Sequence, residues 1–390
     1  MNLRVGEYDV GPTEPVFFIA DIASNHGGDL QKAKELIHAC AESGVDAVKM
    51  QNFSAATIVS DFGFKAMGKL ASHQSNWKNS VFESYRKASI PFDWTIELSA
   101  LATQLGMGYF TSPYSIDLTR AVAPYVCALK LGSGDITWHE QIREMCRHGK
   151  PLFIASGASS LEEVKSAMHV ALSETSEVLL MQCNTNYTAN KHDSLGKIRD
   201  NYAGINLSVL ETYASLWPGL PLGLSDHTHG SMTVLAAVGL FNCCAVEKHF
   251  TLDSSQEGQD HAFSMMPGEW RKMVDETASL RADLSEVVAS DERYRCVAQA
   301  VQYPSLLDVL LGDGHKRVEA NERATVIVQR RAIRAARALE AGQKIAAADV
   351  SMLRPCPEEA LAPCELESVL GKSLLRNIPE GDVIRRTDFT

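Results

Sequence analysis

The amino-acid sequence predicts a (β/α)8 TIM barrel followed by a smaller C-terminal domain. Eight short apolar runs rich in β-branched residues recur along the chain, and segments with helical periodicity separate them. Most runs end in polar or glycine-rich residues. In a barrel such strand ends share one mouth, which favours the barrel over a doubly wound sheet. The expected strands are Val16–Ile22, Asp46–Gln51, Met107–Thr111, Val126–Leu131, Pro151–Ala155, Val178–Gln182, Leu222–Ser225 and Cys243–Phe250.

Helical segments fill the intervals between these strands. The clearest, Leu30–Ser43, follows Asp29, a good N-cap residue, and repeats apolar residues every three to four positions. Strands that alternate with helices indicate parallel βαβ units. The expected buried face of the first helix consists of Ala33, Leu36, Ile37 and Cys40. Further helices are expected at Thr95–Leu105, Ser160–Leu172 and Met232–Gly239.

The chain divides into three parts by composition. We expect the barrel in residues 1–285, a linker with some helix in 286–323, and the small domain in 324–390, where short strands alternate with Pro and Gly turns. A domain of roughly 65 residues is marginally stable alone, so it is expected to lean on a partner surface. The segment Phe53–Phe92, after the second strand, has the length of a functional lid or of a loop that carries short helices of its own.

Composition excludes several classes of protein. The 390 residues include 48 acidic and 37 basic side chains, a formal net charge of −11, so a general nucleic-acid binder is not expected. No apolar run approaches the roughly 18 residues of a membrane helix, and the N-terminus lacks the pattern of a secretion signal. Nine scattered cysteines suit a reduced, cytoplasmic protein, and its expected partners are small molecules or other copies of itself.

Charged and hydroxyl side chains collect at the expected strand ends. Lys49 and Gln51 occupy alternate positions of the second expected strand, and both positions are expected to face into the barrel. A buried charge is costly in free energy unless something binds it. Lys49 and Lys130, with hydroxyl groups at three other strand ends, suit a phosphate or a carboxylate. Either lysine could instead form a Schiff base, as in aldolases. The hydroxyl groups belong to Ser112, Ser133 and Ser225.

Two histidines lie at the ends of neighbouring strands. His227 follows the seventh expected strand and His249 lies in the eighth, with Glu247 and Asp260 near them in sequence. Imidazoles beside carboxylates are common ligands of divalent transition metals, so this spacing predicts a metal site. Asp21, at the end of the first strand, is either a catalytic carboxylate or a residue that orients a neighbour, and the sequence leaves both open.

Taken in order, these motifs resemble the sialic acid synthase family, the condensing enzymes of nonulosonic acid biosynthesis. The C-terminal part looks like the antifreeze-like SAF domain of that family. The resemblance covers nearly the whole chain, and the combination of motifs is specific although no single motif is. The motifs are Ile19–Leu30, Ala47–Gln51, Thr111–Pro113, Leu129–Asp135, Gly223–Thr228, Glu247–Thr251, Asp260–His261, Phe263–Met265, Gln329–Val350, Arg354–Pro355 and Gly371–Lys372.

The resemblance implies a metal-dependent transferase that joins phosphoenolpyruvate to the open-chain aldehyde of an N-acyl hexosamine of the N-acetylmannosamine type. The products would be a nine-carbon 2-keto acid and phosphate. The implied metal is Mn²⁺, with Mg²⁺ or Co²⁺ possible, and its ligands would be His227 and His249. Asp21 would act on the proton of the attacking water. The implied phosphoenolpyruvate contacts are Lys49, Lys130, Ser133, Ser225 and Ser112, and the implied sugar-side residues are Gln51, Asp135, Thr185, Tyr187 and Asp260.

The resemblance further implies a domain-swapped homodimer, in which Arg331 of one small domain reaches the other subunit's barrel to hold the N-acyl group. The sequence departs from the family pattern at Asp21 and Asp135, where glutamate is frequent, and a side chain one methylene shorter shifts a carboxylate. The sugar is therefore left open: a pseudaminic or legionaminic acid synthase that uses a diacetamido trideoxyhexose is the alternative. Rivals are a non-catalytic sugar-binding protein and an aldolase that acts through Lys49 or Lys130.

Overall fold

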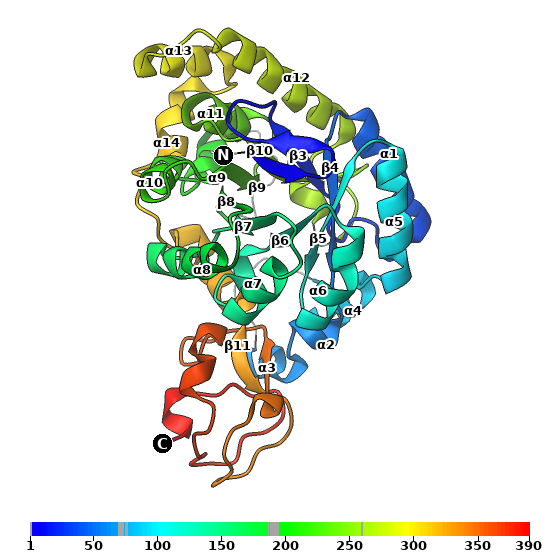
Figure 1. The fold of residues 1–390 in the computed structure, drawn as a ribbon, viewed down its shortest axis with the longest axis vertical. Coiled ribbons are helices and arrows are strands. Elements are labelled where there is room, and N and C mark those ends of the chain that lie inside the picture. The colour runs from blue at the N-terminus through cyan, green and yellow to red at the C-terminus, as the bar shows by residue number, and fades with distance from the viewer. Residues whose placement is uncertain (1, 69–73, 75–76, 186, 188–194, 259) are drawn as a thin grey trace.

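The centre of the molecule is a closed barrel of eight parallel strands (Figure 1). The structure is a computed structural model that describes residues 2–68, 74, 77–185, 187, 195–258 and 260–390. The closed sheet confirms the predicted barrel and excludes the doubly wound sheet, which would have two open edges. The strands are β3 (Phe17–Asp21), β4 (Ala47–Asn52), β5 (Gly108–Pro113), β6 (Ala128–Leu131), β7 (Leu152–Ala155), β8 (Val178–Cys183), β9 (Leu222–Asp226) and β10 (Ala245–His249).

Helices surround this barrel at the positions that the periodicity predicts. Asp29 caps the first of them, because its carboxylate accepts the backbone N–H groups of Gln31 and Lys32. The predicted apolar face of that helix is buried. The surrounding helices are α1 (Leu30–Glu42), α5 (Phe92–Gln104), α6 (Ile116–Val122), α7 (His139–Cys146), α8 (Leu161–Glu174), α9 (Leu195–Tyr202), α10 (Val209–Leu216), α11 (Met232–Phe241) and α12 (Pro267–Asp283).

An N-terminal hairpin that the sequence analysis misses lies against the starts of the barrel strands. Its strands are β1 (Leu3–Val5) and β2 (Tyr8–Val10), which pair antiparallel. Leu3 is fully buried in one apolar cluster with inward-facing residues of the barrel, including Phe17 and Phe110. This packing fills the barrel near the strand starts, so the polar pocket forms at the opposite, carboxyl end.

The long segment after β4 folds over the carboxyl end of the barrel. It contains α2 (Ala55–Ile58), α3 (Asp61–Met67) and α4 (Val81–Ala88). Phe53 packs edge-on against Tyr85 of α4, with ring centroids 5.4 Å apart, and against Tyr114, which follows β5. These contacts make an aromatic wall beside the mouth of the barrel, and the segment carries short helices, one of its two predicted forms.

The last hundred residues pack against the barrel in two steps. In the predicted linker, α13 (Ser290–Ala300) packs on α11 and α12, and α14 (Leu307–Leu311) follows it. After α15 (Arg323–Gln329), the small domain forms around the antiparallel pair β11 (Ala332–Ala335) and β12 (Val350–Leu353). Its apolar core includes Trp138 of the barrel, so the small domain leans on the barrel of its own chain, beside α2, α3 and α7 (Figure 1).

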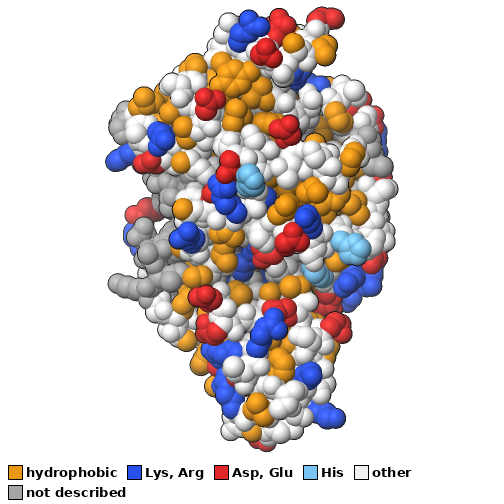
Figure 2. Space-filling model, turned by 90° about the vertical axis from the view of Figure 1, so that its left-hand side faces the viewer, with side chains coloured by type: hydrophobic (Ala, Val, Ile, Leu, Met, Phe, Trp, Pro, Cys, Tyr) orange, Lys and Arg blue, Asp and Glu red, His pale blue; other side chains and the backbone are white. Residues whose placement is uncertain are grey.

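The surface carries charges of both signs. On the face shown in Figure 2, acidic and basic side chains are interspersed. In the described part of the chain, no helix combines the length and the apolar character that crossing a membrane requires.

Candidate functional site

A polar pocket of about 90 Å³ opens at the carboxyl ends of the barrel strands. Most of the residues that the sequence singles out line it, because alternate residues of each strand point inward and the strand ends converge. Asp135, Thr185 and Arg331 are the exceptions. The predicted residues in the lining are Asp21, Lys49, Gln51, Ser112, Lys130, Ser133, Tyr187, Ser225, His227, His249 and Asp260.

Two buried lysines and two buried carboxylates form the charged floor of this pocket. The Nζ atom of Lys49 lies 2.7 Å from Asp21 Oδ2 and 3.5 Å from Glu247 Oε1, and Lys130 Nζ lies 3.6 Å from the same Glu247 oxygen. Burial opposes the charge on Lys49, but Asp21 and Glu247 outweigh it and raise its pKa. Burial lowers the pKa of Lys130, and Glu247 only partly offsets this. The two cations and two anions therefore balance.

Asp21 is held in one orientation by three donors. Its Oδ1 accepts the backbone N–H of Ala23 at 2.9 Å, while Oδ2 accepts Lys49 at 2.7 Å and the Gln51 amide at 3.1 Å. The same Oδ2 lies 3.6 Å from Nε2 of His249. A carboxylate fixed in this way can accept a proton from a substrate or water at the pocket surface.

The two predicted metal ligands come together. The rings of His227 and His249 have centroids 5.3 Å apart, and both pack against Phe263. Nδ1 of His227 lies 3.0 Å from the carbonyl oxygen of Asn184, which orients the ring. Burial lowers the pKa of both histidines, with the neighbouring ring adding to the effect at His249. The imidazoles are therefore neutral and offer nitrogen lone pairs.

This donor set fits a divalent metal ion. Among the described residues, no group of three His, Cys, Asp or Glu side chains is arranged to hold an ion. Two neutral imidazoles could still bind one, with substrate or water completing its shell. In the same part of the chain, Nδ1 of His249 and Oε2 of Glu247 are buried without a hydrogen-bond partner, as expected of atoms that serve an external ligand.

The remaining pocket wall carries hydroxyl, carboxyl and aromatic groups. Asp260 Oδ2 accepts the Ser24 hydroxyl at 2.6 Å, and burial, with the charge of Asp21, raises the pKa of Asp260 to about 6. The ring of Tyr187 lies 4.7 Å from that of His227, measured between centroids. The hydroxyl of Ser112 is buried and makes no hydrogen bond with another described residue. Aromatic faces beside polar groups suit a sugar.

Thr185 lies behind the pocket and is bound by the predicted linker. Its backbone N–H and its hydroxyl both donate to Oε1 of Glu322, at 2.8 and 3.1 Å. The same oxygen accepts the backbone N–H of Ala158, which follows β7. Glu322 is fully buried, so the segment before the small domain fixes the loops after β7 and β8.

Arg331 lies against the barrel of its own chain, and its place in a second subunit's barrel stays a prediction. Its Nε donates to Asp135 Oδ1 of the same chain at 2.8 Å, and it is fully buried. The physical reason is the close approach of α15 to the segment after β6: a Cβ on Gly134 would lie 2.3 Å from the carbonyl oxygen of Gln329, so only glycine fits there. The homodimer stays a prediction.

Known protein families were compared with this chain. A model of the NeuB family matches residues 36–289, and a model of the SAF domain matches residues 330–390. The chain is 31% identical over 384 residues to an N,N'-diacetyllegionaminic acid synthase of Legionella pneumophila, covering 96% of this chain and 94% of that one. The chain belongs to the NeuB family.

Another relative of this NeuB-family chain is also a synthase by name. Over 270 residues it is 29% identical to the N-acetylneuraminate-9-phosphate synthase of Homo sapiens, covering 68% of this chain and 70% of that protein. A solved structure of the spore coat polysaccharide biosynthesis protein SpsE of Bacillus subtilis has a TM-score of 0.75 and 24% identity, covering 100% and 99% of the two chains. This structural likeness supports the fold.

The sequence analysis of this NeuB-family chain misses part of the pocket wall. Tyr114 and Tyr85 line it from the segment after β5 and from α4, and Gln329 and Arg354 line it from the C-terminal part of the chain. Arg354 lies in a motif that carries the SAF resemblance, so its presence was visible in the sequence. Its position in the pocket was not, because the docking of the small domain brings it there.

Proposed function

We propose that this chain is a phosphoenolpyruvate-dependent synthase that condenses phosphoenolpyruvate with the aldehyde of an N-acyl hexosamine to give a nonulosonic acid and phosphate. The observation that carries this proposal is the composition of one pocket. It combines two buried lysines, Lys49 and Lys130, with two neutral histidines, His227 and His249. Lysines suit a phosphorylated substrate, and neutral histidines suit a metal ion beside it. The relatives' names support the same reaction class.

In the proposed reaction, the methylene carbon of phosphoenolpyruvate attacks the aldehyde carbon, and water adds to the former enol carbon. The resulting hemiketal phosphate loses phosphate by cleavage of its C–O bond. Lys49 and Lys130 stabilise the charge on the departing phosphate. We assign acceptance of the water's proton to Asp21, and the hydrogen bonds of Ala23, Lys49 and Gln51 to its two oxygens support this assignment.

We propose Mn²⁺ as the metal, with Mg²⁺ and Co²⁺ as alternatives, bound by His227 and His249. When bound, such an ion polarises the aldehyde oxygen as a Lewis acid. The neutral imidazoles and the unpartnered, buried Oε2 of Glu247 support a cation at this place. The remaining hydroxyl and amide groups, those of Ser112, Ser133, Ser225, Gln51 and Tyr187, would contact the two substrates.

Two sugar classes are candidates for the aldehyde. The first is of the N-acetylmannosamine type. The second is a diacetamido trideoxyhexose, and the relatives favour it: two proteins named N,N'-diacetyllegionaminic acid synthase match 96% and 94% of this chain. The apolar wall of the pocket, which includes Phe53 and Ile58, suits the methyl group of an acetamide.

We also propose that the protein works in the cytoplasm, where phosphoenolpyruvate is made, and that it forms a homodimer. Exchange of small domains between two subunits would place the Arg331 side chain of each against Asp135 of the other. The contact within one chain makes the same pair without exchange. Mixing a variant altered in the barrel with one altered in the small domain separates the two arrangements, since only exchange restores activity.

The test of function is phosphate release from phosphoenolpyruvate with Mn²⁺. The sugars to compare are N-acetylmannosamine, its 6-phosphate and the two diacetamido hexoses, each with a chelator control. Release with one sugar that stops on chelation supports the proposal and names the substrate. Sugar binding without release with any of them supports the non-catalytic rival. Borohydride trapping of substrate on Lys49 or Lys130, indifferent to chelator, supports the aldolase instead.

A further inference from the structure

Three arginines of the small domain contact the barrel: Arg330 binds Glu163 of α8, whereas Arg331 and Arg354 both reach Asp135. The latter two differ in how their hydrogen bonds are satisfied. Arg331 uses all five of its N–H groups within the chain. Nε and Nη2 donate to the two oxygens of Asp135, at 2.8 and 3.3 Å. The other three N–H groups donate to the carbonyl oxygens of Thr57, Met352 and Tyr114, at 2.8, 2.6 and 2.9 Å. Arg331 is therefore a docking residue with no donor left for a substrate.

Arg354 instead lines the pocket. Its side chain is 5% exposed, and its guanidinium lies 5.2 Å from the centre of the Tyr114 ring. Nη1 donates to the Tyr85 hydroxyl at 3.2 Å and to the Gln329 side-chain oxygen at 2.5 Å. Nε is buried and has no hydrogen-bond partner among the described residues. A buried donor of this kind costs free energy unless a ligand satisfies it.

The charge around Arg354 is not balanced by its neighbours. Among the described residues, the carboxylate that Arg354 contacts is that of Asp135, with Nη2 3.4 Å from Oδ1, and Arg331 binds the same oxygen more closely, at 2.8 Å. One carboxylate thus serves two guanidinium groups. The floor of the pocket offers no counter-charge, because Lys49 and Lys130 already balance its two carboxylates. The two guanidinium groups that share Asp135 thus leave one positive charge in excess beside Arg354, while the remaining carboxylate of the pocket wall, Asp260, is bound by Ser24.

The arrangement of the N–H donors that Arg354 leaves for a ligand indicates which kind of ligand it binds. The Nε and Nη2 donors of a guanidinium form a planar fork that matches the two oxygens of a carboxylate. In Arg354, Nε has no partner within the described residues and Nη2 has only the long contact with Asp135. Arg354 and Lys49 line the same pocket, so a small anion bound there meets both cations.

We infer that Arg354 binds the carboxylate of phosphoenolpyruvate, while Lys49 and Lys130 hold its phosphate. This inference rests on the proposed function. It makes the small domain part of the phosphoenolpyruvate site, so that the substrate's carboxylate links the small domain to the barrel.

The test measures binding to the full chain by titration calorimetry, without sugar, in the same divalent salt. Arg354→Met should weaken phosphoenolpyruvate binding by about 10- to 100-fold, the range for losing a charge-assisted hydrogen bond, and leave the binding of inorganic phosphate unchanged. Arg354→Lys keeps the charge but loses the fork, so its loss should be intermediate. The lysine variant also keeps the test open if the methionine variant does not fold.

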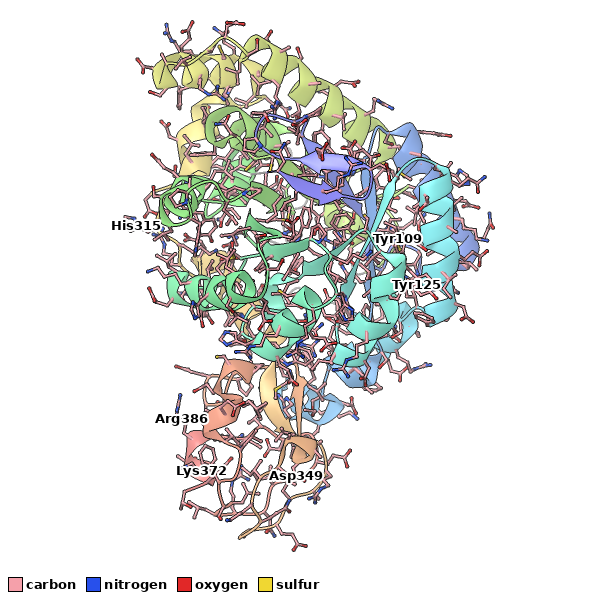
Figure 3. All side chains as sticks on the ribbon, in the orientation of Figure 1. Tyr109, Tyr125, His315, Asp349, Lys372 and Arg386 are labelled. Carbon is pink, nitrogen blue, oxygen red and sulfur yellow. The ribbon has the colours of Figure 1, made fainter. Side chains whose placement is uncertain are left out.

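Arg386→Met is the matched control. Arg386 belongs to the small domain, is exposed and lies at the left side of that domain in Figure 3, where it pairs with Glu365. This variant removes one positive charge from the same domain and should bind phosphoenolpyruvate as the native chain does. An equal loss in the control would mean that the effect comes from the overall charge, which overturns the inference.

The outcomes separate this inference from the proposed function. If the native chain does not bind phosphoenolpyruvate, the proposed function fails. If it binds and the folded Arg354 variants bind equally well, only the role of Arg354 fails. Equal weakening of phosphoenolpyruvate and inorganic phosphate would assign Arg354 to the phosphate and overturn the carboxylate assignment.

Discussion

Removing Lys248 should destabilise the protein strongly, because it pairs with Asp226 behind the two histidines. The two residues are neighbours in the register of β9 and β10, on the face opposite to His227 and His249. Lys248 Nζ lies 2.5 Å from Asp226 Oδ2, and both side chains are 1% exposed. The same lysine donates to the carbonyl oxygen of Thr228 at 2.6 Å. This pair ties together the strand ends that carry the histidines.

The magnitude follows from what Lys248→Met leaves behind. Asp226 would keep the hydroxyl groups of Thr228 and Thr233 and lose its counter-charge. Breaking a buried ion pair from one side costs about 3–5 kcal/mol, and replacing both partners costs less. Burial alone would raise the pKa of Asp226, but Lys248 and the hydrogen bonds outweigh it and lower that pKa. The pair's stabilisation is therefore present above the ordinary aspartate pKa and is lost as the pH falls.

Urea unfolding at pH 7, followed by circular dichroism, measures this cost. The Asp226→Asn and Lys248→Met single variants and their double variant complete a double-mutant cycle. Lys65→Met is the matched control, since Lys65 and its partner Asp61 are 72% and 41% exposed and should contribute less than about 1 kcal/mol. A loss below about 1 kcal/mol for Lys248→Met, or a double variant as unstable as the sum of the singles, would refute the reasoning.

Four further substitutions test the site. Lys130→Met should lower phosphate release at least 100-fold and raise the KM for phosphoenolpyruvate, measured by steady-state kinetics. His249→Ala should lose both activity and bound manganese, and full retention of manganese by elemental analysis would contradict its role as a ligand. Gly134→Ala should lower the melting temperature by several degrees and expose the small domain to proteases, because its Cβ would lie 2.3 Å from the Gln329 carbonyl oxygen. Asp260 has its pKa raised from 3.8 to about 6, mainly by burial, so its ionisation destabilises the fold as the pH rises through that window. Asp260→Asn should therefore flatten the stability profile between these two values, and an unchanged profile would count against it.

Much of the barrel and its polar mouth could be predicted because both depend on local patterns. A run such as Val178–Gln182 is apolar and short because a parallel strand is buried on both faces. The alternation of side chains along the second strand predicted that Lys49 and Gln51 point into the barrel, and both residues of β4 line the pocket. The pairing of His227 with His249 followed from their places at neighbouring strand ends. These inferences need only periodicity and the rule that parallel strand ends share one edge.

The sequence by itself thus determined the class of fold, the charged floor of the pocket and its two histidines. The tertiary structure alone decided which residues of the C-terminal part reach the site. It assigned Arg331 to docking and Arg354 to the pocket wall, and it placed Glu322 behind the loops after β7 and β8. These contacts join segments more than 130 residues apart. No local periodicity in the sequence indicates which side chain keeps unpaired hydrogen-bond donors once these segments have packed together.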